Sequence, residues 1–425
     1  MNVSLPRGTR DYSPSEAILL NKITGIIEET FKSFGFYPLD TPGIELMETL
    51  NGKAYGEDAR KELYVLEGKE EGLRYDFTVP LARHMAMNRD IPLPFKRYQI
   101  GKVWRMDEPQ KMRAREFIQA DIDVVGSSEP ISDAESIAAV AVAIEKTGVA
   151  DYTVFINSRA VLDAVLNLFG VPKERHIEAI RALDKLSKIG REDVAKQIVK
   201  LGAEKGKTEA LLDFIGDSGE NKKTIDKLMQ KVPEAKEAIG RLSTILSLIE
   251  RYKLKGKMTI DLSLARGLDY YTGGIWEFVV FEEGKRLPTI ASGGRYDNLM
   301  EMYSRNSVPA VGTAIGVSRL FEVLDKGEIL RTNSKVHVAY IKEENLEYAM
   351  EVANQMRQAG IYVDLGVTKR ALSKQLEYVN SMRIRHVAIL GNQEREAKKV
   401  KLRDMISGEE ELLGIDEAIS RLRNV

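Results

Sequence analysis

The polar residues with the most suggestive spacing lie in residues 95–126, which we expect to form two strands joined by a charged loop. Side chains alternate between the faces of a strand, so residues two apart share a face. On the first strand, Arg97, Gln99 and Arg105 share a face. One face of the second strand carries a ring, an amide and two carboxylates, at Phe117, Gln119, Asp121 and Asp123. Its other face is apolar, which predicts a buried back and a polar front that faces a ligand.

The loop between these strands, residues 106–115, concentrates positive charge at Lys111, Arg113 and Arg115. A guanidinium stays charged and its planar fork binds two phosphate oxygens at once. The hairpin is therefore a candidate phosphate-binding surface. An ordinary solvated hairpin with a charged loop has the same pattern, so the spacing alone leaves both interpretations open.

A second candidate segment is RGLDYYTGGIWEF, residues 266–278, in which Arg266 and two tyrosines precede a Gly pair. The alternative is a turn that leads into a strand, with Tyr270 and Tyr271 in the core.

The third candidate is ASGGRYDNLM, residues 291–300, followed by a Gly-rich strand that leads into a helix near Arg319. Small residues at Gly312, Ala314 and Gly316 would let a flat group approach one face of this strand closely. Ordinary packing of a strand against a helix is the alternative.

The composition excludes several other chemistries. The chain has no Cys, which rules out a thiol nucleophile, a disulfide framework and a zinc–cysteine site. The four histidines show no ligand spacing, so we predict no metal site built from protein side chains. The nearest match to a P-loop, residues 202–208, is one residue short and follows no strand.

The charge balance excludes a histone-like or polybasic protein, because 63 Lys and Arg face 64 Asp and Glu in 425 residues. It does not exclude a local basic surface. No apolar run approaches the ~20 residues of a membrane span, and the first ten residues lack the apolar core of a signal peptide. We therefore expect a cytoplasmic protein.

The elements that must position these residues follow from periodicity. Residues 14–34 have apolar residues at helical spacing, residues 36–126 read as short antiparallel strands, and Ser132 with Glu135 resembles a capping box. Strands return at 258–264, 275–281 and 311–317, after a helical block at about 172–252. We predict an α+β domain over residues 1–326, with an antiparallel sheet and this block as an insertion. Three independent domains in a row are the less favoured alternative.

Residues 332–425 have a different texture. Three short apolar strands, at 336–341, 361–365 and 386–390, alternate with helical segments, and a charged strand and a closing helix follow. This order predicts a C-terminal α/β domain with a small mixed, mainly parallel sheet.

Six segments in order resemble the signature sequences of the histidyl-tRNA synthetases, a family of class II aminoacyl-tRNA synthetases. They are PRGTRDYSP (6–14), GFYPLDTPGIE (35–45), LRYDFTVPLAR (73–83), VWRMDEPQKMRAREFIQADID (103–123), RGLDYYTGGIWEF (266–278) and VGTAIGVSRL (311–320). The resemblance covers nearly the whole chain. Because six segments agree in order, coincidence is a poor explanation.

The resemblance implies a histidine–tRNA ligase, which activates L-histidine with ATP to histidyl-adenylate and transfers it to the 3′ end of tRNA(His). The attacking carboxylate is already ionised near pH 7, so the chemistry needs alignment and charge compensation rather than a protein base. Arg266 and Arg105 match the family's catalytic arginines at the α-phosphate. Mg²⁺ is implied with the ATP, on the leaving pyrophosphate.

The resemblance also assigns the binding residues. Those implied for histidine are Asp76, Thr78 and Gln119 at its amino and carboxylate end and Asp123, Tyr270 and Tyr271 around its ring. Those implied for ATP are Arg105, Glu108, Arg113, Phe117, which would stack on adenine, and Arg319.

For tRNA, the family reads the acceptor end near Gln110 and Arg115, and residues 332–425 resemble its anticodon-binding domain. Basic positions in that domain would meet phosphates or form an ordinary solvated face. The segment with Pro42 resembles the motif that makes class II enzymes homodimers. No membrane partner is implied.

The chain departs from the family pattern at a few positions. Family members often carry Glu where this chain has Asp76 and Asp123, and Tyr where it has Ala114. With Asp at both positions, the chain resembles the archaeal and eukaryotic branch of the family, and the loop sequence EPQ resembles that of archaeal members. Ala114 puts one loop contact on the adenine side in doubt.

Two other functions compete with the ligase. The regulatory subunit of ATP phosphoribosyltransferase is synthetase-like but charges no tRNA, and it would lack the Arg266 segment and the C-terminal domain. A tRNA-binding module without catalysis would leave Asp76, Asp123 and Tyr271 unexplained.

Overall fold

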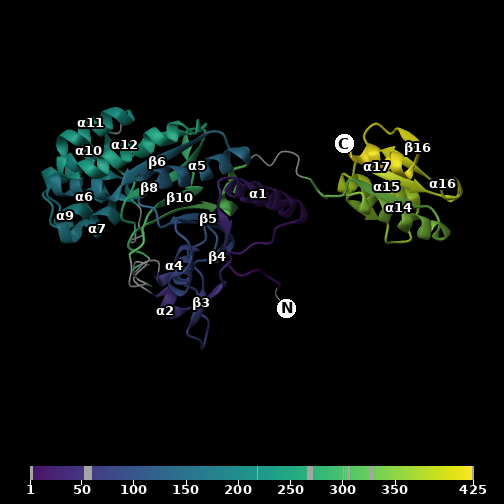
Figure 1. Cartoon of the computed structure of the whole chain (residues 1–425), viewed down its shortest axis with the longest axis horizontal. Coiled ribbons are helices and arrows are strands. Elements are labelled where there is room, and N and C mark those ends of the chain that lie inside the picture. The colour runs from purple at the N-terminus through teal and green to yellow at the C-terminus, as the bar shows by residue number, and fades with distance from the viewer. Residues whose placement is uncertain are drawn as a thin grey trace. The chain divides into compact units, whose positions relative to one another are not determined.

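Figure 1 shows the computed structural model, which describes residues 3–51, 60–217, 219–265, 271–299, 301, 303, 307–324 and 330–423. The chain divides into two compact units, the first within residues 1–10 and 23–325 and the second within 11–22 and 326–425. The boundary near the N-terminus falls inside helix α1 (Pro14–Ser33), which matches the helix predicted over residues 14–34.

The first unit is built around a large, mainly antiparallel sheet. Among the described residues this sheet has nine strands, in the spatial order β1-β4-β5-β11-β10-β8-β6-β7, with β9 beside β8. The strands are β1 (Tyr37–Pro38), β4 (Phe95–Trp104), β5 (Glu116–Val125), β6 (Tyr152–Ser158), β7 (Lys257–Ile260), β8 (Gly274–Glu282), β9 (Lys285–Arg286), β10 (Ala291–Arg295) and β11 (Ala310–Gly316). The pairs β1–β4 and β6–β7 are parallel, and the other neighbours are antiparallel.

The hairpin predicted over residues 95–126 is formed by β4 and β5, and its register fixes the polar front. Arg97 lies opposite Asp123, and Gln99 lies opposite Asp121. On its other edge β5 pairs with β11, where Gly312 lies opposite Asp123. The polar face of β5 is therefore flanked by polar residues on one side and by small residues on the other.

A small two-stranded sheet and two helices precede this hairpin in the chain. Strand β2 (Ile44–Leu46) pairs with β3 (Glu71–Leu73), followed by α4 (Thr78–Met87), and the short α2 (Met47–Leu50) contacts α4. Val79, Leu81 and neighbouring apolar residues anchor α4 in the core, so the residues at its amino end are held rigidly.

Helix α5 (Pro130–Lys146) packs on the sheet against β11 and β10, and its alanine-rich surface is almost wholly buried. The predicted capping box at Ser132 is wrong. The N-cap is Glu129, three residues earlier, with Pro130 in the first turn, and the Ser132 hydroxyl donates to the Glu129 carbonyl oxygen at 2.6 Å.

The segment 172–252, where the strand signal is missing, is helical in the structure. Its α-helices are α7 (His176–Leu183), α8 (Leu186–Ile189), α9 (Arg191–Lys200), α10 (Lys205–Gly216), α11 (Asn221–Lys231) and α12 (Lys236–Glu250). They follow α6 (Arg159–Leu168) and gather on one side of the sheet in Figure 1. Helix α12 contacts α5 and β6, which ties the helical block to the sheet.

The second unit contains a five-stranded sheet in the order β13-β12-β14-β15-β16. Its strands are β12 (Val336–Tyr340), β13 (Val363–Leu365), β14 (His386–Leu390), β15 (Lys399–Asp404) and β16 (Glu410–Gly414), and its helices are α14 (Leu346–Gln358), α15 (Leu372–Met382), α16 (Asn392–Ala397) and α17 (Ile415–Arg423). The first three strands in this order are parallel, whereas β15 pairs antiparallel with β14 and β16 pairs antiparallel with β15. The predicted mixed sheet is confirmed, although α16 and β16 were not anticipated.

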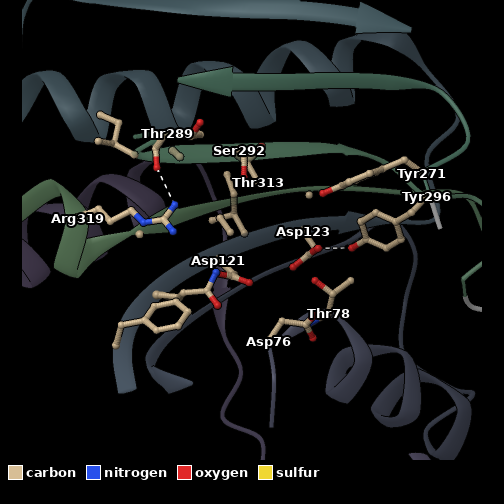
Figure 2. Close-up of a pocket in the computed structure, with 18 of the residues that line it drawn as sticks. Asp76, Thr78, Asp121, Asp123, Tyr271, Thr289, Ser292, Tyr296, Thr313 and Arg319 are labelled. Atoms are coloured by element: carbon tan, nitrogen blue, oxygen red, sulfur yellow. Dashed lines mark hydrogen bonds between the residues drawn. The ribbon is translucent and has the colours of Figure 1, made fainter. Parts of the chain in front are cut away.

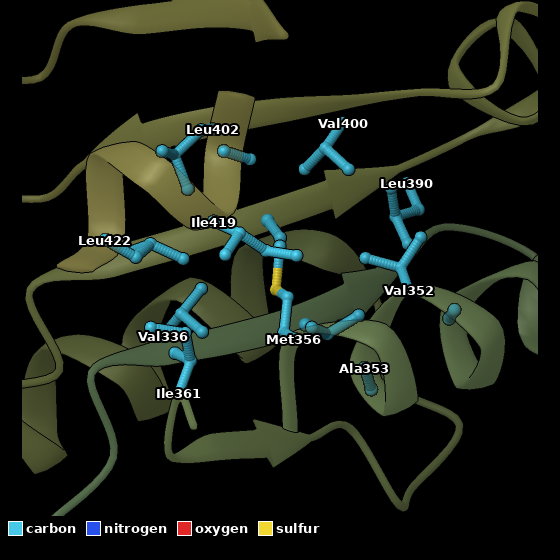
Figure 3. Packing of buried hydrophobic residues seen from close by; sticks show 14 of the residues in the cluster. Val336, Val352, Ala353, Met356, Ile361, Leu390, Val400, Leu402, Ile419 and Leu422 are labelled. Atoms are coloured by element: carbon cyan, nitrogen blue, oxygen red, sulfur yellow. The ribbon is translucent and has the colours of Figure 1, made fainter. Parts of the chain in front are cut away.

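The two faces of this sheet are covered by different helices. On one face, Val336 of β12 packs with Val352 and Met356 of α14 and with Ile419 of α17, as Figure 3 shows. Val338 belongs to the same buried cluster. On the other face, apolar residues of β14 pack against Val379 of α15. Every residue of β12 is therefore buried, as expected of a strand covered on both faces.

Candidate active site

A pocket opens over β5, β11 and β10 (Figure 2). It is lined by Asp76, Thr78, Arg105, Phe117, Gln119, Asp121, Ile122, Asp123, Tyr271, Thr289, Ile290, Ala291, Ser292, Tyr296, Gly312, Thr313, Ala314, Gly316 and Arg319. The predicted polar face of β5 thus lies at the pocket floor, and segments from the whole first unit converge on it.

At one end, Asp76 is fixed by the amino terminus of α4. Its Oδ1 accepts hydrogen bonds from the backbone N–H groups of Thr78, at 3.0 Å, and Val79, at 3.1 Å. The first turn of a helix leaves such N–H groups without intrahelical partners, so a carboxylate there is held in place and stabilised.

Asp123 lies deeper in the same end of the pocket and is held from two sides. Arg97 forms an ion pair with it at 2.5 Å, and the Tyr296 hydroxyl donates a hydrogen bond to its Oδ1. Burial raises the pKa of Asp123, and Arg97 and Tyr296 oppose that rise. A Cβ at Gly312 would overlap the Asp123 carboxylate, so glycine is required opposite this residue.

Arginines occupy the other end of the pocket. Arg105 donates to the Tyr75 carbonyl oxygen at 3.2 Å and to Gln119 Oε1 at 3.4 Å, and its guanidinium lies 5.2 Å from the centre of the Phe117 ring. Arg319 donates to the Thr289 carbonyl oxygen at 3.0 Å. The pocket is therefore electrically polar, with carboxylates at one end and guanidiniums at the other.

The charged loop of the hairpin is arranged differently from the prediction of a simple phosphate-binding surface. Arg113 forms a two-point ion pair with the buried Asp107, at 2.7 and 2.6 Å, and Arg115 donates to the Asp107 carbonyl oxygen. Burial acts to raise the pKa of Asp107, but the hydrogen bonds from Arg113 lower it. Asp107 was not singled out from the sequence and is the carboxylate that organises this loop.

The remaining predicted residues of the loop lie apart from the pocket wall. Glu108 is exposed and pairs with Arg7 at 2.8 Å, while Gln110 exchanges backbone hydrogen bonds with Arg113. Glu108, Gln110, Arg113 and Arg115 are not among the described residues that line the pocket.

Two predicted residues, Arg266 and Tyr270, lie outside the described residues. Conversely, Tyr296 lines the pocket but was not predicted as a site residue. The signal that could have drawn attention to it is its place directly after the Gly-rich strand β10, within the third candidate segment.

The described residues contain no group of three or more His, Asp or Glu that could hold a metal ion. In the same part of the chain, no helix is both long enough and apolar enough to cross a membrane.

Comparison with known proteins gives the context for this pocket. A family model for histidyl-tRNA synthetase matches residues 8–320, and a model for an anticodon binding domain matches residues 335–425. The chain belongs to the histidyl-tRNA synthetase family. This confirms the resemblance found in the sequence motifs, and with it the predicted class of enzyme, an aminoacyl-tRNA synthetase.

Relatives of this family match along the whole chain. Histidine–tRNA ligases from the archaea Aeropyrum pernix and Korarchaeum cryptofilum are 36% and 37% identical to it, each over 99% of this chain and 98% of the relative. A histidyl-tRNA synthetase from Nostoc superposes with a TM-score of 0.87 at 31% identity, covering 100% of this chain and 99% of that one. This likeness supports the predicted fold class.

The competing function is less well supported. A Bacillus halodurans structure, described as an ATP phosphoribosyltransferase regulatory subunit/histidyl-tRNA synthetase, has a TM-score of 0.76 but only 21% identity, covering 91% of this chain and 97% of that one. That likeness shows a shared fold, whereas relatives of higher identity are histidine–tRNA ligases.

Proposed function

We propose that this protein activates L-histidine with ATP and transfers the histidyl group to tRNA(His). The observation that carries the proposal is the electrical polarity of the pocket, with Asp76 and Asp123 at one end and Arg105 and Arg319 at the other. Histidyl-adenylate has the complementary distribution, because its ammonium and ring lie at one end and its phosphate at the other.

The ring of histidine would bind at the deep, acidic end. An imidazole has one donor and one acceptor nitrogen, and a carboxylate with a phenol can satisfy both. We assign these roles to Asp123 and Tyr271. An apolar amino acid of similar size would offer neither group a hydrogen bond from the ligand side, at a cost of about 1–3 kcal/mol for each bond lost.

The amino and carboxylate end of histidine would lie near Asp76, Thr78 and Gln119, next to Arg105. The histidine carboxylate then attacks the α-phosphorus of ATP and pyrophosphate leaves. Arg105 would compensate the charge that develops on the phosphate oxygens, a task for which a fixed guanidinium is suited. On the family resemblance we assign the same task to Arg266.

The nucleotide would lie toward Arg319, with adenine on the Phe117 ring. Arg113 would reach the outer phosphates once it leaves Asp107, and we keep Glu108 as an ATP-binding candidate. Mg²⁺ would enter with ATP, held mainly by the nucleotide's own phosphates.

We assign residues 1–326 as the catalytic domain and residues 332–425 as the anticodon-binding domain. The second assignment is supported by the family model over residues 335–425. Gln110 and Arg115 would contact the acceptor end of tRNA. An activity that uses ATP and tRNA fits a cytoplasmic enzyme.

We also propose a homodimer. The segment that resembles motif 1 exposes Tyr37 at 66% and Ile44 at 50%, and Leu46, directly after it, is 56% exposed. A twofold interface would bury them. Sedimentation equilibrium tests this assignment, and a monomer at micromolar concentration would contradict it.

The decisive experiment for the activity is histidine-dependent exchange of pyrophosphate into ATP, measured with the full chain. We expect exchange with L-histidine and none with phenylalanine or leucine. Charging of tRNA(His) would then complete the assignment. A folded protein without exchange would disprove the proposal, and exchange without charging would restrict it to the first step.

A further inference from the structure

A third pocket carboxylate, Asp121, has no role in the scheme above. It lies between Gln119 and Asp123 on the pocket face of β5 and is 3% exposed. Its Oδ1 has no hydrogen-bond partner among the described residues. A buried carboxylate oxygen without a partner is costly, so its presence in a ligand pocket needs an explanation.

The neighbouring strands do not satisfy this carboxylate. Opposite it on β4, the Gln99 side chain is already engaged, because its Nε2 donates to Asp40 and its Oε1 accepts from Thr41, each at 3.1 Å. Opposite it on β11 lies Ala314, whose side chain has no polar atom. Asp121 is thus placed toward the pocket with no side-chain partner across either strand pairing.

The surrounding charges make the acidic end of the pocket receptive to a cation. Asp76, Asp121 and Asp123 are all buried there, and the buried Arg97 is already paired with Asp123. Burial raises the pKa of Asp121 well above its usual range, and Asp123 and Asp76 add to this while Arg97 and Arg105 oppose it. A cationic ligand group would relieve this repulsion.

The position of Asp121 along the strand indicates which cationic group of the substrate it contacts. Residues two apart on a strand are about 7 Å apart, so Asp121 lies midway between Gln119 and Asp123. In the proposed orientation these two contact the carboxylate end and the ring of histidine. The ammonium group branches from the carbon between them, and it has three N–H bonds to donate.

Building on the proposed function, we propose that Asp121 binds the α-ammonium group of the histidine substrate and supplies an ionic acceptor beside Asp76, Thr78 and Gln119. Asp121 is then a substrate-binding residue that discriminates amino acids from their deaminated analogues.

Calorimetric titration of the full chain tests this with three ligands. L-histidine carries the ammonium and the carboxylate, histamine lacks the carboxylate, and 3-(imidazol-4-yl)propionate lacks the ammonium. The variant Asp121→Asn keeps the shape and removes the charge. Glu116→Gln, on the same strand but not among the described pocket residues, is the matched control.

We expect Asp121→Asn to weaken L-histidine and histamine by about 10-fold or more and to leave imidazolepropionate unchanged. Glu116→Gln should bind all three like the unmodified protein. Equal weakening of all three ligands would show that Asp121 only shapes the pocket, and no weakening would show that it does not contact the ammonium. Either result overturns the proposal.

A second variant, Asp121→Ser, gives the same test if the Asn protein does not fold, as judged by circular dichroism. Measurements on the unmodified protein distinguish failure of the proposed function from failure of the role of Asp121. If it neither binds histidine nor exchanges pyrophosphate, the proposed function itself fails. If it does both while the Asp121 variants retain full histidine affinity, only the role of Asp121 fails.

Discussion

The two neighbouring carboxylates of β5 have different environments although they share one face. Asp123 is held by Arg97 and Tyr296, whereas Asp121 Oδ1 has no partner among the described residues. Both carboxylates face the proposed ligand, but in the empty pocket only Asp123 already has protein partners on both sides. A pocket built in this way lowers the stability of the empty protein and raises its affinity for the ligand.

The burial of Asp121 predicts that the stability of the protein depends on pH. The pKa of Asp121 is raised by folding, so the folded protein holds its proton longer than the unfolded chain, and stability falls as pH rises from the unfolded pKa toward the folded pKa. We expect Asp121→Asn to gain stability over the unmodified protein progressively above pH 4, by about 1 kcal/mol or more at pH 7.5. Urea unfolding between pH 4.5 and 8 measures this, and a difference that does not vary with pH would contradict it.

If Arg266 has the proposed role, its substitution by Ala removes one charge-compensating group from the reacting phosphate and should lower histidine-dependent pyrophosphate exchange by about 10²–10³-fold. Binding of histidine should survive. The control is Arg251→Ala, an exposed arginine after α12. Equal loss of binding and exchange would show that Arg266 supports the pocket rather than the reaction.

Residue-level prediction from sequence succeeded where alternation along a strand determines the outcome. Gln119, Asp121 and Asp123 line one pocket because side chains two apart must share a face. It failed for Tyr296, which reaches Asp123 from 173 residues further along the chain. No local period encodes that contact, since it depends on the order of β5, β11 and β10 in the sheet.

At the scale of elements, the helical block is joined to the sheet by a buried ionic cluster. Asp133 of α5 accepts from Arg295 of β10 and from Arg241 of α12, each at 2.7 Å. Asp133 is fully buried and Arg295 is 3% exposed, whereas the Arg241 side chain is 28% exposed. One carboxylate therefore serves a core arginine and an arginine of the inserted helices.

Replacing this carboxylate should be far more damaging than replacing its outer partner. We expect Asp133→Ala to lower the free energy of unfolding by about 3–5 kcal/mol, because it leaves Arg295 buried without its main counter-charge. Arg241→Ala should cost about 1 kcal/mol. Urea unfolding of both variants provides the comparison, and similar costs would indicate that the cluster is not a buried pair in solution.

Element boundaries were predictable where glycine, proline or a change of period marks them. The predicted helix of residues 14–34 and strand of residues 386–390 match α1 and β14. Strand β6 and helix α6 were missed because residues 152–168 pass from period two to period 3.6 without a break in hydrophobicity. The class of both sheets was therefore predictable from sequence, but not every strand and helix of the first unit.

At the scale of the whole molecule, the pocket and the mixed C-terminal sheet belong to separate compact units. Each unit has its own buried apolar cluster, so damage to one core need not damage the other. The two steps of the proposed reaction should therefore be separable by mutation.

Met356→Ala tests this separation. Met356 is fully buried in the α14 core, and truncation should destabilise the second unit by about 2–5 kcal/mol. We expect charging of tRNA(His) to fall while histidine-dependent exchange is kept. The control is Met350→Ala on the same helix, where the side chain is 48% exposed. Parallel loss of both activities would show that the units depend on each other.

The chain has two tryptophans, and one of them lies next to the pocket. Trp276 of β8 is fully buried, and its indole N–H donates to the Thr313 hydroxyl at 3.0 Å, where Thr313 is a lining residue. The other, Trp104, bonds to Glu116 at the end of β4. In a Trp104→Phe protein, Trp276 would be the remaining indole, in contact with the pocket residue Thr313. Its fluorescence would then report occupancy of the pocket in real time, without any attached dye.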